Sequence, residues 1–115
     1  MAKRPLPIDD SRSDWQRSFD DLRALSVRED DWDGEGAVRP KPELLEAAAD
    51  WLRRLSTEDS SAAAPSYVSA TPCGEVAVVW RSDELLLSAE FVEPDRIEWM
   101  RRVPGQPTEH WDQAV

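Results

Sequence analysis

The chain has 115 residues and a formal net charge of −10, from 24 acidic and 14 basic side chains. This length suits one domain, and the acidic balance argues against unaided binding to nucleic acid or to acidic membranes, which requires cationic side chains. One cysteine, Cys73, excludes a disulfide within the chain and a cysteine-based zinc site, and the lack of a long apolar run or secretory signal predicts a cytoplasmic protein.

Residues 1–12 contain Pro5 and Pro7 and few apolar side chains, a composition typical of a flexible N-terminal arm. Ser13 is followed three residues later by Gln16, a capping-box pattern that predicts the start of ordered structure. The apolar residues that follow recur at helical spacing and predict a helix over residues 14–26. They are Trp15, Phe19, Leu22 and Leu25.

Acidic residues crowd the stretch from 20 to 35, which carries seven acidic side chains against two arginines and so half of the net charge. Within it lies the sequence Trp32-Asp33-Gly34-Glu35-Gly36-Ala37, followed by Pro40. Two glycines that flank a carboxylate predict a tight structural loop in which Gly34 and Gly36 adopt positive φ. We expect Trp32 to pack against the helices.

A second helix is predicted to begin at Pro42, because proline suits the first turn of a helix. Glu43 and Glu46 suit its positive N-terminal end, and Arg53 and Arg54 suit its C-terminal end. Its buried stripe is predicted to consist of Leu44, Ala48, Trp51, Leu52 and Leu55. The small, polar residues 56–65 then predict a flexible connection.

After this connection the hydrophobic period changes to two, which indicates strands. Strands are predicted over residues 67–70, 76–81, 85–92 and 96–103. The short turns between them favour an antiparallel meander. Residues 104–115 lack periodicity and predict a C-terminal tail, which leaves a single domain over residues 13–103.

The predicted fold class is therefore α+β, with two amphipathic helices packed on one face of a three- to four-stranded antiparallel meander sheet. The other face is left to water or to a partner. Leu86 and Val92 point to that face from their strand, so an apolar contact strip is expected there. Trp111, in the predicted tail, either folds back on the domain or anchors a partner.

The glycine loop, the helix after Pro40 and the later pattern Pro72-x-Gly74-x-Val76-x-Val78-x-Trp80 together resemble a group of short, largely uncharacterised bacterial proteins. In that group a W-D-G-x-G-A element precedes a helix and a P-x-G-x-aliphatic-x-aliphatic-x-W hairpin. The match spans residues 14–103, and its motifs carry no assigned chemistry. The resemblance implies a bacterial or phage cytoplasmic protein from a mobile or defence-related locus.

Asp31, Asp33 and Glu35, followed by Gly36, reproduce the start of a calcium loop, in which alternate oxygens converge on the ion. The end of the loop does not match, because the position of the bidentate glutamate holds Pro42. A tight turn without an ion explains the same residues, so no metal and no other cofactor is predicted, and these three residues remain only a weak metal candidate.

Catalysis has little support in the sequence. The only histidine, His110, lies in the predicted tail, and Cys73 lies in a predicted exposed turn. No phosphate-binding glycine loop with its lysine is present. Glycoside hydrolysis needs only two carboxylates at a defined separation, but a domain of this size offers little cleft. The sequence therefore predicts that the protein is not an enzyme.

Three hypotheses follow. The first is an acidic protein-binding module, in the style of an inhibitor, antitoxin or immunity protein, whose carboxylates engage a basic protein surface. The second is an accessory subunit that joins a larger assembly or a homodimer through its apolar sheet face. The third is a metal-dependent or carboxylate enzyme. The candidate partner-binding residues are Glu29, Asp30, Asp31, Trp32, Asp33, Glu35, Leu86, Val92 and Trp111.

Overall fold

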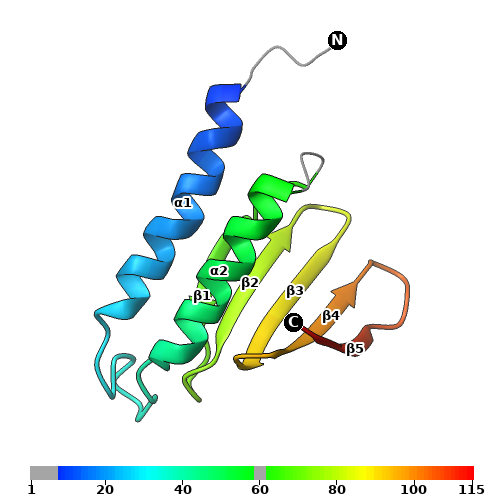
Figure 1. Ribbon diagram of the computed structural model, residues 1–115. Coiled ribbons are helices and arrows are strands. Elements are labelled where there is room, and N and C mark those ends of the chain that lie inside the picture. The colour runs from blue at the N-terminus through cyan, green and yellow to red at the C-terminus, as the bar shows by residue number, and fades with distance from the viewer. Residues whose placement is uncertain (1–7, 59–61) are drawn as a thin grey trace.

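The computed structural model describes residues 8–58 and 62–115, and in these residues it contains two α-helices and one five-stranded antiparallel sheet. Figure 1 shows the two helices side by side over the sheet, running roughly along the direction of β2 and β3, with β4 and β5 to one side. The elements are α1 (Ile8–Ser26), α2 (Pro42–Glu58), β1 (Tyr67–Ala70), β2 (Val76–Arg81), β3 (Leu86–Glu93), β4 (Arg96–Arg102) and β5 (Glu109–Ala114). The α+β class agrees with the sequence prediction.

The first helix starts earlier than predicted. It begins at Ile8, so Ser13 lies inside the helix and not at its N-terminal cap. Part of the predicted arm is therefore helical, and residues 1–7 lie outside the described residues. The C-terminal half of α1 buries Leu22 and Leu25, while Trp15 and Phe19 pack against the same core.

The second helix begins at Pro42 and continues one turn beyond the two arginines that the sequence places near its end. Ser56 and Thr57, which we expected in the connection, belong to this last turn. Their hydroxyls donate hydrogen bonds to the backbone carbonyl of Arg53, one turn earlier in the same helix. The fully buried side chains of α2 are Leu44, Ala48 and Leu52.

The sheet has the order β1-β2-β3-β4-β5, so every strand pairs with the next one along the chain. The prediction of three or four strands was too low, because the expected tail folds into β5 and pairs with β4. Pro104 and Gly105 form the turn between them, with Gly105 at a φ of 82° and the N–H of Gln106 bonded to the carbonyl of Val103. A β-bulge between Phe91 and Glu93 shifts the register at the start of the β3–β4 turn.

The core lies where the helices meet alternate residues of the strands. Val76 and Val78 of β2 pair in register with Phe91 and Ala89 of β3, and Phe91 pairs with Ile97 of β4. All five are buried in one cluster with the apolar residues of α1 and α2. Directly paired residues share a sheet face, so this cluster defines one face of the sheet as the core face.

Among the described residues, neither helix combines the length and the apolar character needed to cross a membrane.

Candidate functional site

The acidic loop, residues 29–39, uses its own carboxylates to fix its backbone. Asp33 Oδ1 accepts hydrogen bonds from the backbone N–H groups of Glu35, at 2.8 Å, and Ala37, at 3.1 Å. These bonds favour the ionised form and hold the pKa of the Asp33 carboxyl below its usual value. Asp33 therefore organises the loop from within.

Asp31 closes the same loop. Its Oδ1 accepts a hydrogen bond from Gly36 N–H at 2.6 Å, and its own N–H donates to the carbonyl of Ala37 at 2.6 Å. Asp31 has a φ of 64°, beside Gly34 at 75° and Gly36 at 88°. Three residues with left-handed backbone conformation within six positions produce the tight turn. Of these three, only Asp31 has a side chain, so only at Asp31 is the positive φ sterically unfavourable.

Asp30 and Trp32 fix the end of the loop. Asp30 Oδ1 accepts a hydrogen bond from the backbone N–H of Arg39 at 3.0 Å, and Trp32 Nε1 donates to the carbonyl of Val38 at 2.9 Å. The guanidinium carbon of Arg28 lies 4.4 Å from the centre of the Trp32 ring, a cation–π arrangement. Trp32 thus packs within its own loop and not against the helices as we expected.

The loop is joined to the turn between β1 and β2. Val38 N–H donates to the carbonyl of Pro72 at 2.8 Å, and Lys41 N–H donates to the carbonyl of Gly74 at 2.9 Å. Pro40 is buried between these two contacts in the sequence. The two motifs on which the resemblance rests therefore lie against each other, and their contacts are structural.

The candidate metal ligands form no ion site in the described residues, and Cys73 and His110 lie apart. Within residues 8–58 and 62–115, no group of three or more His, Cys, Asp or Glu side chains is placed to hold an ion. Cys73 is a free, exposed thiol in the β1–β2 turn, whereas His110 lies on β5 at one edge of the sheet. β3 and β4 separate β2 from β5, so the structure does not bring the thiol and the imidazole together.

A cluster of tryptophans lies on the core face, at the side of the sheet next to β5. Trp99 and Trp111 are directly opposite each other in the β4–β5 pairing, with centroids 5.9 Å apart and planes at 4°. Trp80 stacks on the other side of Trp99 at 6.1 Å. Trp51 of α2 meets Trp80 and Trp99 edge-on, at 6.2 and 5.9 Å. Trp111 thus packs on its own domain and yet is 43% exposed.

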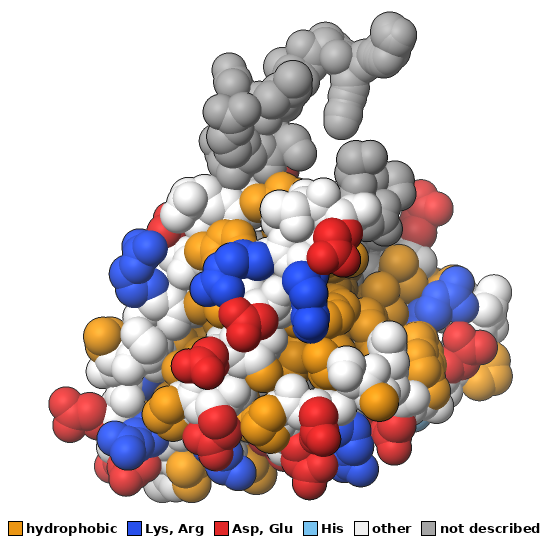
Figure 2. Space-filling view, viewed as in Figure 1, with side chains coloured by type: hydrophobic (Ala, Val, Ile, Leu, Met, Phe, Trp, Pro, Cys, Tyr) orange, Lys and Arg blue, Asp and Glu red, His pale blue; other side chains and the backbone are white. Residues whose placement is uncertain are grey.

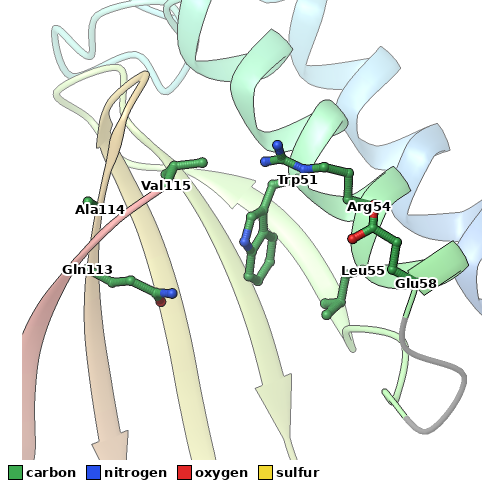
Figure 3. Close-up of a pocket in the computed structure, with 7 residues that line it drawn as sticks. All are labelled: Trp51, Arg54, Leu55, Glu58, Gln113, Ala114 and Val115. Carbon is green, nitrogen blue, oxygen red and sulfur yellow. The ribbon is translucent and has the colours of Figure 1, made fainter.

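Beside this cluster is a cavity of about 520 Å³ between α2 and β5, which we call the indole groove. Figure 3 shows the Trp51 indole projecting from α2 toward the sheet between the two walls of the groove. Figure 2 shows hydrophobic surface gathered between α2 and the strands beside it. The groove is lined by Trp51, Arg54, Leu55, Glu58, Gln113, Ala114 and Val115.

The edge of α2 beside the groove is acidic. A second cavity of about 320 Å³ shares Arg54 and Val115 with the indole groove, so the two hollows adjoin. Glu43, Glu46 and Asp50 line this second cavity, and all three are exposed. Acidic side chains therefore border a hollow with both polar and apolar lining, although Arg54 also lines it and Asp50 is paired with Arg53. This combination suits a ligand with both cationic and apolar parts.

The opposite face of the sheet carries a row of acidic side chains. Glu90 pairs with Glu98, and Glu98 pairs with Asp112. Burial, together with a hydrogen bond and the charge of Glu75 and the charge of Glu98, raises the pKa of Glu90 to about 7. Burial is the largest cause, and the neighbouring carboxylates add to it because ionising all of them at once is unfavourable.

The apolar strip expected on the opposite face is small. Leu86 is half-buried between Arg81 and Arg102, its register partners on β2 and β4. Val92 is half-buried at the β-bulge and has no register partner on β4. These two residues lie at opposite ends of β3, so they do not form a continuous surface.

A scan of protein-family models, a search of curated proteins and a search of solved structures each returned no match to this chain.

Proposed function

We propose that the protein is a non-enzymatic binding module that takes a basic, partly apolar segment of another protein into the indole groove. The observation that carries this proposal is the half-buried Trp51 between two walls of a cavity whose helical border is acidic. Tryptophan is enriched among the residues that dominate binding energy at protein interfaces.

The layers of the fold support a partner at this position. We infer that both helices pack on the core face of the sheet, α1 against β1 and α2 against β2 and β3. β4 and β5 then extend past the helical layer, with Trp99 and Trp111 on the same face as the core. A partner segment beside α2 would continue the helical layer and cover these indoles, in the way that amphipathic helices fill hydrophobic grooves.

Charge supports a basic partner over an acidic one. Glu43 and Glu46 line the hollow that adjoins the groove, together with Asp50, which pairs with Arg53, and the whole chain carries −10. Acidic surfaces accelerate the encounter with basic ones, and this effect weakens as salt rises. In this proposal the acidic loop contributes long-range attraction, while contact is made at the groove.

Indole N–H resonances offer a direct test, because the tryptophans lie in different parts of the fold. Two short amphipathic helical peptides with identical leucine positions, one with lysine and one with glutamate at every polar position, would be titrated into the ¹⁵N-labelled protein. We expect the lysine peptide to shift the Trp51 and Trp99 resonances and to leave Trp32, in the acidic loop, unmoved. The glutamate peptide should shift none of them.

Leu55→Lys is the matching variant, because it places a charge in the groove wall. Val27→Lys is the control, since Val27 is 75% exposed and distant in sequence from both groove walls. Both variants add one positive charge, so a difference between them cannot come from net charge. Only Leu55→Lys should weaken binding of the lysine peptide. A shift of Trp32 alone would move the site to the acidic loop, and no shift with either peptide would contradict the proposal.

A further inference from the structure

The two edge strands of the sheet, β1 and β5, differ in what packs against them. At the β1 edge, α1 packs against the strand, and Asp21 Oδ2 accepts a hydrogen bond from Val68 N–H at 3.0 Å. At the other edge, β5 has β4 as its single neighbouring strand among the described residues, and all six of its residues are exposed. One edge is thus capped and the other is open.

β5 lacks three of the features that usually protect an open edge. It contains no proline and no lysine, and its pairing with β4 shows no bulge. Its charged side chains are Asp112 and Glu109, the second of which pairs with Arg101. Exposed edge strands without such features are templates for pairing with another strand. Trp111, at the middle of this edge, keeps 43% of its surface exposed.

The hydrogen-bond pattern identifies the free backbone groups. Val115 N–H donates to the carbonyl of Asp95 at 2.9 Å, so this pair is of the hydrogen-bonded kind. In an antiparallel ladder hydrogen-bonded pairs alternate with non-bonded pairs. Counting back from Val115, residues 109, 111 and 113 turn their backbone groups toward β4. His110, Asp112 and Ala114 turn theirs outward, where a further strand would bond.

We propose that the occupant of this edge is a second copy of the chain, paired antiparallel through β5 with Trp111 on the two-fold axis. In this register His110 of each copy lies opposite Asp112 of the other, so a carboxylate meets an imidazole twice. The outward backbone groups of these two residues then bond to each other. The two Trp111 side chains form the close, non-bonded pair and extend the stack of Trp80 and Trp99 across the axis.

The neighbouring registers of the β5–β5 pairing are less favourable, so we expect the two copies to pair in this one register. A shift that places Asp112 on the axis sets two carboxylates directly opposite each other. A shift that places His110 on the axis pairs Trp111 with Glu109 and loses both the indole contact and the His–Asp pairs. Like charges in direct opposition destabilise a strand pair, whereas opposite charges and aromatic pairs stabilise it. Self-pairing of β5 does not require the peptide ligand proposed above.

Sedimentation velocity of the full chain, over a wide concentration range and without peptide, tests the proposal. We expect a dimer that dissociates on dilution. His110→Asp places carboxylates opposite each other at two sites and should raise the dissociation constant of the dimer by roughly tenfold or more. Asp112→His alone should also weaken the dimer. The double variant His110→Asp with Asp112→His exchanges the partners and should restore the dimer.

Asp112→Pro gives a second, backbone-based test. Proline at this position removes an N–H that points away from β4, so the monomer should remain folded while self-pairing is blocked. Gln113→Pro is the contrasting control, because it removes an N–H that faces β4 and should destabilise the fold itself. A wild-type monomer at all concentrations, or a dimer that survives both Asp112→Pro and the single charge changes, would overturn the proposal.

Discussion

Lys41 and Gly74 are joined by a 2.9 Å hydrogen bond from the backbone N–H of the first to the carbonyl of the second. This bond lays the segment after the acidic loop across the β1–β2 turn. A Cβ atom on Gly74 would lie 2.8 Å from the carbonyl oxygen of Arg39, closer than real contacts allow. The turn therefore requires glycine at this position both for its φ of 85° and for its lack of a side chain.

Gly74→Ala should destabilise the protein more than Gly36→Ala. Both positions have similar positive φ, so both variants lose roughly 1–2 kcal/mol from backbone strain. A Cβ at Gly36 meets no atom within 4 Å, whereas at Gly74 it meets a backbone oxygen that cannot easily move. We expect a further loss of about 1–3 kcal/mol for Gly74→Ala. Urea unfolding of the two variants measures the difference, and equal losses would contradict this account.

Asp21→Ala should destabilise the β1 edge by roughly 1–3 kcal/mol, the usual cost of leaving a buried donor without its acceptor. The donor is the N–H of Val68, a residue only 6% exposed. Asp21→Asn keeps a carbonyl oxygen in place and should lose less. Asp20→Ala is the matched control, because Asp20 makes an exposed ion pair with Arg23 that should contribute less than about 1 kcal/mol. Chemical denaturation of the three variants tests the order.

The sequence predicts much of the fold because local periodicity carries the information. The β1 and β2 boundaries and the start of α2 follow from alternation, turn residues and Pro42. The start of α1 does not, since residues 9–13 are all polar and Ile8 alone makes no apolar stripe. β5 was missed for a related reason: an edge strand exposed at all six residues has no buried face to impose alternation. The Pro104–Gly105 turn was its one local signal.

The candidate site could be predicted even less. Trp80, Trp99 and Trp111 are far apart in the sequence, and only the meander with its fifth strand places them in one stack. The acidic residues of the loop, in contrast, are evident in the sequence, but the structural role of their carboxylates is not. From the sequence, Asp31 and Asp33 are candidates for binding a partner or an ion. In the structure, both carboxylates accept backbone hydrogen bonds within the loop. Charge counts do not reveal which carboxylates are already engaged.

Asp33→Asn should make the acidic loop less stable near neutral pH. It should also change how the free energy of unfolding depends on pH in acid. Because the folded state lowers the pKa of Asp33 from 3.8, its contribution is complete above the unfolded value and disappears as pH falls through the folded value. The difference in free energy of unfolding between the wild type and Asp33→Asn should therefore become smaller as the pH falls. Glu35→Gln removes one charge from the same loop without touching the Asp33 bonds, and it should not reproduce this effect in thermal unfolding.

Glu90 should produce a dependence on pH of the opposite sign. Burial and the neighbouring Glu75 and Glu98 raise its pKa from 4.5 to about 7, so between these values the folded state binds more protons than the unfolded state. The free energy of unfolding should accordingly fall as pH rises from 4.5 to 7. Glu90→Gln cannot ionise and should flatten this slope, which makes the variant more stable than the wild type at alkaline pH.

Glu75→Gln separates the causes of that slope. It leaves the burial of Glu90 unchanged and removes the neighbouring carboxylate that bonds to it and repels it. The pKa of Glu90 should then move down toward 4.5 without returning to it, and the pH range over which stability declines should shrink from its upper end. Denaturant unfolding across this pH range, with carbon-detected NMR titration of the Glu90 carboxyl, measures both quantities. If the decline in stability with pH persists in Glu90→Gln, other carboxylates on the face of the sheet opposite the core must cause it.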